Sequence, residues 1–113
     1  MTLPTTIDAT ACCVPRVTTS LSIRDAERAS RVFKALGDPT RVRLLSLIAA
    51  GEAGEACICN LTDPVGLSQA TVSHHMRLLA EAGLVTREQR GRWAYFTLNT
   101  ETLDAAADAL RTA

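Results

Sequence analysis

The sequence predicts a single, mainly helical domain with one small β-hairpin. The chain has 113 residues, which is enough for one domain with one modest core. Hydrophobic residues make up 47% of the chain and aromatic residues only 4%. The core must therefore be built from Ala, Leu and Val, which favours packed helices over a sheet sandwich. A core of this size is only marginally stable alone, so dimerisation is an expected source of further stability.

The chain divides into an N-terminal arm and a folded domain. Residues 1–20 are rich in Thr, Ala and Pro and show no hydrophobic periodicity, so we expect a flexible arm that carries Cys12 and Cys13. Residues 21–112 show helical and then strand-like periodicity, and we expect them to form the folded domain.

Two helices open the domain. The helical pattern of residues 21–36 stops at Gly37. Asp38 and Pro39 then start a second helix, because Asp caps free N–H groups and Pro tolerates the first helical position. We expect this helix to cover residues 40–50 and to bury one stripe of side chains. The stripe comprises Val42, Leu45, Ile48 and Ala49.

A short helix, a turn and a longer helix follow. We expect the short helix to run from Cys57 to about residue 63 and to be closed by Pro64. Gly66 supplies a tight turn, and Ser68 caps a helix that runs to residue 82 and stops at Gly83. This arrangement is the helix-turn-helix plan.

The last third of the chain predicts a hairpin and a final helix. Residues 84–98 alternate in strand fashion, and residues 88–91 (EQRG) are the expected hairpin tip. From Thr100 a helix presents one side with Leu103, Ala106, Ala107 and Leu110. The complete order predicts a winged helix-turn-helix domain.

The long helix has the composition of a DNA-recognition helix. Val72, Met76, Leu79 and Ala80 share one face and are expected to point into the core. The opposite face is small and polar, so the backbone could lie deep in the major groove. An ordinary solvated face is the alternative, but Glu and Lys, which normally fill such a face, are absent between residues 68 and 80. The DNA-contact candidates here are Ser68, Gln69, Ala70, Thr71, Ser73, His74 and Arg77.

Arginines in the hairpin add to this prediction. Arg87, Arg90 and Arg92 are opposed only by Glu88, and a basic wing could follow the phosphate backbone or enter the minor groove. A charge run is often only solvated surface, but its position after a helix-turn-helix favours DNA binding. The 12 basic and 12 acidic residues give zero net charge, which argues against a nonspecific nucleic-acid coat.

The adjacent histidines do not predict a metal site. His74 and His75 project about 100° apart on a helix, so they cannot easily share one ion. His75 points nearer the core face, and we expect it to be packed and hydrogen-bonded there.

Four cysteines form two close pairs, Cys12 with Cys13 and Cys57 with Cys59. The sequence shows no signal peptide and no apolar run of membrane-spanning length, so we expect a cytoplasmic protein with reduced thiols. Adjacent Cα atoms lie only about 3.8 Å apart, below the usual range for a disulfide. We therefore interpret the cysteines as ligands or redox groups rather than as structural disulfides, although any single one could be a small core residue.

An all-sulfur ligand set selects soft ions: As(III), Sb(III), Cd(II), Pb(II), Cu(I) or, less readily, Zn(II). On a regular helix Cys57 and Cys59 point to nearly opposite sides, so they can chelate together only if the helix start is unwound. Three sulfurs suffice for As(III). We expect Cys12 and Cys13 to act with Cys57, and Cys59 to be a fourth ligand or a spare.

The sequence resembles the ArsR/SmtB family of metal-responsive repressors over residues 21–112. The strings that carry the resemblance are FKALGDPTRVRLL at 33–45, EACICNL at 55–61, LSQATVSHHM at 67–76 and RGRWAYF at 90–96. The resemblance implies a homodimer that pairs through its first and last helices and binds imperfect palindromic operator DNA. It also implies DNA contacts from Gln69, Ala70, Ser73 and His74.

The resemblance also bears on the cysteines. Cys57 and Cys59 match the metal or arsenite site near the helix-turn-helix of arsenite and cadmium/lead sensors, and Cys12-Cys13 resembles the paired N-terminal cysteines of actinobacterial-type arsenite sensors. The family's N-terminal arm can reach the partner subunit, so the site could bridge two chains. Asn60 stands where Asp is usual, and Ala70 where Pro is frequent. The last helix has no His, so the family's zinc site there is not expected.

These observations predict a repressor that leaves its operator when cysteine thiolates bind As(III) or Sb(III), with no organic cofactor and no membrane partner. The alternatives are a Cd(II)/Pb(II) sensor with four thiolates and a thiol-redox repressor. A thiol enzyme would need a low-pKa cysteine beside a base, or Cys-x-x-Cys on a βαβ scaffold, and neither pattern is present.

Overall fold

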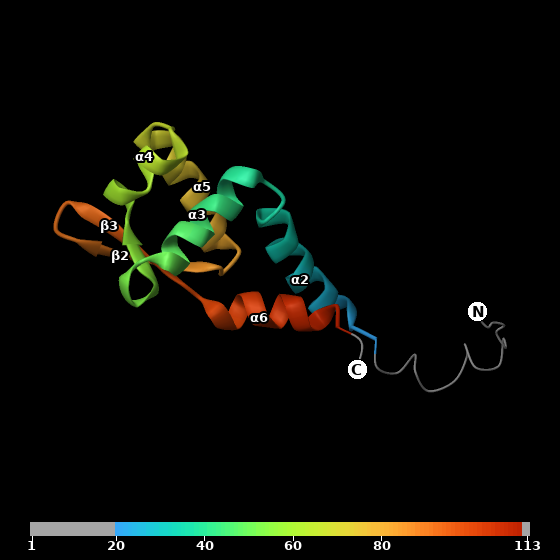
Figure 1. The fold of residues 1–113 in the computed structure, drawn as a ribbon. Helices are drawn as coiled ribbons and strands as arrows, with labels where there is room; N and C mark the ends of the chain where they lie inside the picture. The colour runs from blue at the N-terminus through green and yellow to red at the C-terminus, as the bar shows by residue number, and fades with distance from the viewer. Residues whose placement is uncertain (1–19, 112–113) are drawn as a thin grey trace, which may run out of the picture.

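The computed structural model describes residues 20–111, which form helices around a small sheet (Figure 1). The expected arm, with Cys12 and Cys13, lies outside the described residues. In chain order the helices and strands are α2 (Ile23–Ala35), α3 (Pro39–Ala50), the 3₁₀ turn η2 (Glu52–Gly54), β1 (Glu55–Cys57), the 3₁₀ turn η3 (Ile58–Asn60), α4 (Thr62–Val65), α5 (Gln69–Glu81), β2 (Val85–Arg90), β3 (Trp93–Leu98) and α6 (Thr100–Ala109).

The start of α3 is capped as the sequence predicts, but its buried face differs. The Asp38 carboxylate accepts hydrogen bonds from the backbone N–H groups of Thr40 (2.8 Å) and Arg41 (3.3 Å), and Pro39 occupies the first turn. The buried residues are Leu44, Leu45 and Ile48. The prediction for Val42 and Ala49 was wrong, because both are exposed. Helix α3 packs against β3, α5 and β1, a strand that the sequence reading omitted, and Leu44 is buried in the core.

The short helix predicted from Cys57 to about residue 63 is present only as two turns, η3 and α4, and its predicted start at Cys57 was wrong. Residues 55–57 are extended and pair with β3, and the helical turn of α4 begins only at Thr62. Pro64 lies within α4 rather than after it, which is allowed because a first-turn residue needs no N–H donor. Helix α4 ends at Gly66, which has the expected turn conformation with φ +68°.

The three strands form an antiparallel sheet in the order β1-β3-β2. Cys57 is paired with Tyr95, and Arg90 is paired with Trp93. The hairpin turn therefore consists of Gly91 and Arg92, two residues later than the predicted tip. A two-residue hairpin turn needs positive φ at its first central residue, and Gly91 supplies it with φ +64°.

The core lies between the sheet and helices α2, α3, α5 and α6. Val72, Met76 and Leu79 from α5 are fully buried, as predicted, and Ala80 is half-buried. Helix α6 lies beside α2, and of its predicted apolar side only Ala106 is buried (Figure 1). No helix in the described part of the chain is long and apolar enough to cross a membrane.

Candidate DNA-reading surface and cysteine site

Helix α5 begins at a well-formed cap. The Ser68 hydroxyl accepts a hydrogen bond from the Thr71 backbone N–H (3.2 Å) and donates one to the Thr71 hydroxyl (3.0 Å). Gly66, two residues earlier, reverses the chain direction between α4 and α5. The cap and the turn together fix where the N-terminal end of α5 emerges from the core.

The outward face of α5 is as polar and open as the sequence predicts. Gln69, Ala70, Thr71, Ser73, His74 and Arg77 are all exposed. The Arg77 guanidinium lies 3.1 Å from Nδ1 of His74 and donates to the Glu81 carboxylate at 3.1 Å. Glu81, which the sequence reading did not consider, thus offsets part of the positive charge at the C-terminal end of this face.

The recognition helix and the wing together line one hollow of about 420 Å³. Its polar lining consists of Gln69, Ser73, Arg77, Arg87, Gln89 and Arg92. Gln89 was missed, although it lies two residues from Arg87 and so shares its face of β2. The Arg87 guanidinium donates to the Gln89 side chain at 2.7 Å. Five of the predicted DNA-contact residues therefore border one surface.

Arg90 is placed differently from the other wing arginines. Its guanidinium donates to both carboxylate oxygens of Glu55 (2.7 and 2.9 Å) and to Glu88, and lies 4.4 Å from the centre of the Tyr95 ring. The hydrogen bond from Arg90 outweighs the effect of burial and lowers the pKa of Glu55. Glu55 was not considered in the sequence reading, which offered no long-range pairing for it.

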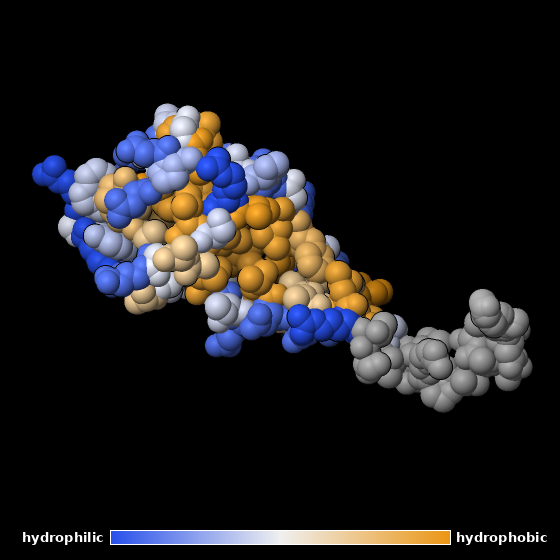
Figure 2. Space-filling model, in the orientation of Figure 1, coloured by the Kyte–Doolittle hydropathy of each residue, from blue (hydrophilic) through white to orange (hydrophobic). Residues whose placement is uncertain are grey.

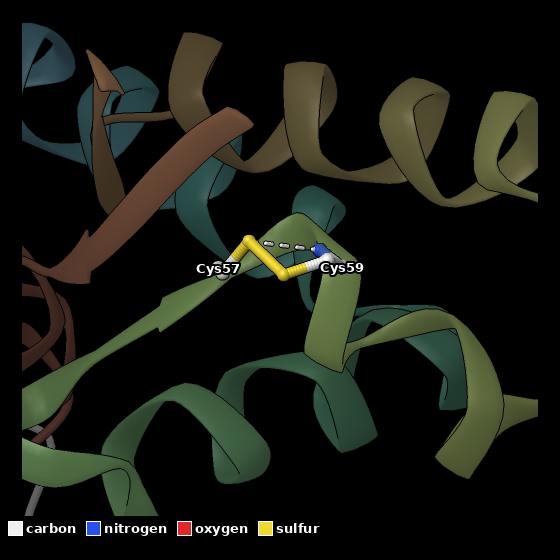
Figure 3. The surroundings of a disulfide bond; sticks show 2 residues. All are labelled: Cys57 and Cys59. Atoms are coloured by element: carbon white, nitrogen blue, oxygen red, sulfur yellow. Dashed lines mark hydrogen bonds between the residues drawn. A yellow bond between two sulfur atoms is a disulfide. The ribbon is translucent and has the colours of Figure 1, made fainter. Parts of the chain in front are cut away.

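The structure joins Cys57 and Cys59 in a disulfide (Figure 3). The expectation that these two cysteines form no disulfide is therefore wrong, whereas their expected role as metal ligands or redox groups stays a prediction. The change from strand to 3₁₀ turn between them sets their Cα atoms 5.1 Å apart, within the disulfide range. The same irregular backbone meets the condition for joint chelation, because the sulfurs lie together rather than on opposite sides of a helix.

The two cysteines differ in access. Cys57 is 2% exposed, its Sγ accepts a hydrogen bond from the Cys59 backbone N–H (3.1 Å), and Cys59 is exposed. Cys57, but not Cys59, borders a hollow of about 320 Å³ that is also lined by Glu52, Glu55, Asn60 and Tyr95. Across residues 20–111, no three His, Cys, Asp or Glu side chains converge as a metal site.

His75 is packed inside, as predicted. It is half-buried, and its Nδ1 lies 3.2 Å from Nη1 of Arg41. Arg41 Nε also donates to the Ala35 carbonyl at 2.5 Å, so this guanidinium links the end of α2, the start of α3 and the middle of α5. Burial opposes the charged form of nearby Asp38, but hydrogen bonds from the Arg41 and Thr40 N–H groups keep its pKa below the ordinary value.

Known proteins are similar to this chain in sequence and in fold. The family described as "Bacterial regulatory protein, arsR family" matches residues 38–87. The chain is 40% identical to a putative arsenical resistance operon repressor of Halobacterium salinarum, over 89% of this chain and 84% of that one. It is 35% identical to the arsenical resistance operon repressor of Bacillus subtilis (64% and 67%) and 34% identical to a cadmium resistance regulatory protein homologue of Staphylococcus aureus (78% and 71%).

The fold is found in solved structures of such regulators. One is the homodimeric winged helix-turn-helix DNA-binding domain of a possible ArsR-family regulator from Mycobacterium bovis. It superposes with a TM-score of 0.63 at 26% identity, over 79% of this chain and 83% of that one. Together with the recognition helix, the wing and the sequence relatives, this shows that the chain belongs to the ArsR family and is a transcriptional regulator rather than an enzyme.

Proposed function

We propose that this chain is a repressor that binds operator DNA as a homodimer and dissociates when its cysteine thiolates bind As(III) or Sb(III). The observation that carries the proposal is the shared hollow between α5 and the wing, where Gln69, Ser73 and Arg77 adjoin Arg87 and Arg92. The relatives named as arsenical resistance repressors support the choice of inducer.

In this proposal α5 enters the major groove of a palindromic operator. Gln69, Ser73 and His74 are exposed near the N-terminal half of the helix, where they could reach base edges, with Ser68, Ala70 and Thr71 beside them. Arg87 and Arg92 would contact phosphates from the wing. Within residues 20–111, no hydrogen bond or ion pair engages the Arg92 side chain, so its charge is available to DNA.

The dimer would form through α2 and α6. Large hydrophobic side chains are exposed along these helices: Leu21 is 41% exposed, Ile23 79% and Leu110 68%. The two helices border a groove of about 540 Å³, and Figure 2 shows hydrophobic residues gathered on the molecule's surface beside them. Burying such side chains against a second copy would stabilise a domain whose own core is small.

Inducer binding would require the reduced form of the cysteine pair, because thiolates and not disulfide sulfurs bind soft ions. Cys57 would supply one thiolate, with Cys12 and Cys13 as the others and Cys59 as a fourth or a spare. Each thiol would lose a proton on binding. This chemistry needs a reducing compartment, and we therefore place the protein in the cytoplasm.

An electrophoretic mobility-shift titration of the reduced protein on its own promoter DNA tests the proposal. Arsenite or antimonite should release the DNA, whereas the variant with all four cysteines changed to serine should bind DNA and ignore both. Release of DNA by the four-serine variant, or no release by the unmodified protein with either metalloid, would refute thiolate sensing of As(III) and Sb(III). Loss of binding after Gln69→Ala and Ser73→Ala together is expected if α5 reads the operator.

Two alternatives have their own support. A Cd(II) or Pb(II) sensor with four thiolates is favoured by the cadmium-resistance relative. Cys59→Ser separates it from the arsenite sensor, because this change should impair a four-thiolate site but spare a three-thiolate one. A redox repressor is favoured by the disulfide between Cys57 and Cys59. Release by peroxide, reversed by a dithiol and without any metal, would identify it.

A further inference from the structure

The sheet separates two sets of side chains by face. Residues alternate along a strand, and the register places Glu55 and Cys57 of β1 on the same face as Tyr95 of β3 and Glu88 and Arg90 of β2. Phe96 and Val85, which are 3% exposed, lie on the other face with Arg87 and Gln89. Cys57 and Arg90 thus share one face of the sheet, and the hollow beside α5 borders the other.

Arg90 bridges the wing and the cysteine-bearing strand. It sits at the outer end of β2, and its two hydrogen bonds to Glu55 reach across β3 to β1, which does not itself pair with β2. Between them lies Tyr95, which is directly opposite Cys57 and lies under the Arg90 guanidinium. The side chains of Glu55 and Arg90 are 28% and 42% exposed, so the bridge is partly shielded from water.

We propose that Arg90 is a positioning residue that fastens β1 to the wing, so that the chemical state of Cys57 sets the position of the wing on DNA. Arg90 would then act through Glu55 and Tyr95 and not by contacting phosphate. This inference rests on the proposed function, since it describes how the cysteine site of that repressor would reach its DNA surface.

The geometry of β1 explains why a change at Cys57 would be transmitted. The strand has only three residues, Cys57 is its last, and a buried side chain cannot move without its neighbours. A dithiol reduces the Cys57–Cys59 bond by giving it two electrons and two protons. The bond between the two sulfurs breaks, both cysteines become thiols, and the dithiol closes into a cyclic disulfide. The Cys57 sulfur is then no longer held to the next turn, and metal binding would pull it in a further direction.

Trp93 offers a direct readout of wing position. It is the only tryptophan of the chain, it begins β3 opposite Arg90, and it is 37% exposed. In a Cys12→Ser, Cys13→Ser background only the Cys57–Cys59 pair can change state. Reduction of that background protein by dithiothreitol should shift the Trp93 emission. The shift should be lost in Glu55→Gln and kept in Glu88→Gln, which removes the other carboxylate partner of Arg90 but leaves the bridge to β1.

DNA binding supplies the second readout, with all four cysteines present. Arsenite should weaken operator binding of the unmodified protein by about tenfold or more. Glu55→Gln should keep its metal-free affinity but respond by only about threefold or less, and Glu88→Gln should respond in full. Arg90→Lys keeps the positive charge but cannot donate two parallel hydrogen bonds to the Glu55 carboxylate, so its arsenite response should be as weak as that of Glu55→Gln. If Glu55→Gln does not fold, the response of Arg90→Lys tests the inference instead.

The inference would be overturned by no Trp93 shift on reduction, by an equal shift in Glu55→Gln, or by an equal loss of arsenite response in Glu88→Gln. If arsenite fails to release the unmodified protein while the Trp93 shift depends on Glu55, the proposed inducer is wrong and the coupling stands. If arsenite releases the unmodified protein and Glu55→Gln equally, the proposed function stands and the role of Arg90 does not.

Discussion

Replacing Arg41 with alanine should loosen the recognition helix from the rest of the domain. The Arg41 side chain is only 15% exposed and holds three elements together. Its Nε donates to the Ala35 carbonyl at the end of α2 (2.5 Å), and its Nη1 meets Nδ1 of His75 in the middle of α5 (3.2 Å). The truncation would leave both partners without this donor in a partly buried place, where water replaces it poorly.

The expected cost follows from these two contacts. A hydrogen bond that involves a charged group contributes about 1.5–3 kcal/mol, and the partial exposure of this site favours the lower value for each. The Asp38 carboxylate is 4.0 Å away, an ion pair worth roughly 0–1 kcal/mol. We therefore expect Arg41→Ala to reduce the free energy of unfolding by about 3 kcal/mol, which lowers Tm by roughly 12–24 °C in a domain of this size.

Thermal denaturation followed by circular dichroism at one fixed protein concentration measures this cost. Arg43→Ala is the matched control: it removes an arginine from the same helix that makes one exposed hydrogen bond, to the Pro64 carbonyl at 2.9 Å. That control should cost less than about 1 kcal/mol. Equal losses of stability in the two variants would refute the claim that Arg41 holds α2, α3 and α5 together. So would an Arg41→Ala protein that keeps both its Tm and its operator affinity.

Three further predictions follow from single contacts. Ser68→Ala removes the α5 cap and should cost about 1 kcal/mol of stability by urea denaturation, whereas Ser68→Asp should restore it. If Arg92 contacts a phosphate, Arg92→Gln should make the slope of log K for DNA binding against log salt concentration shallower by about 0.9 per wing. The control Arg111→Gln, at the exposed end of α6, should leave this slope unchanged. Hydrogen bonding lowers the pKa of Asp38 in the folded protein, so its stabilising effect is fully present above the unfolded value of about 3.9 and is lost as pH falls through the folded value. Asp38→Asn, which retains the cap, should therefore show a smaller fall in Tm between pH 6 and pH 3, and identical pH profiles would contradict the assignment.

Local signals account for what the sequence predicted well. Capping residues and helical periodicity act within a few residues, so the start of α3, the start of α5 and the buried face of α5 could all be read from the chain. The errors lie where a distant partner decides the outcome. Residues 55–57 have too few side chains to show a strand period, and only pairing with β3 makes them extended. The exposure of Val42 also depends on distant partners, because α3 packs against β3, α5 and β1.

The candidate site shows the same division between local and distant causes. The polar face of α5 followed from a 3.6-residue period, and its exposed residues are those predicted. The environment of Cys57 and Cys59 could not be predicted, because it depends on a change from strand to 3₁₀ helix between the two residues. Glu55 lies 35 residues from Arg90, and no pattern in the sequence indicates that they meet.

The faces on which the wing arginines lie follow from the correct bounds of strand β2. Arg87 and Arg90 are three residues apart, an odd number, so in one regular strand they must lie on opposite faces of the sheet. The misplaced hairpin tip treated Arg90 as a loop residue and grouped it with Arg92, and this hid the alternation. Once the turn is assigned to Gly91 and Arg92, the two-residue period of the strand places Arg87, which borders the α5 hollow, and Arg90, which contacts Glu55, on opposite faces. Charge clustering in a sequence therefore predicts a wing, but only the strand register decides which of its arginines share a face with the α5 hollow.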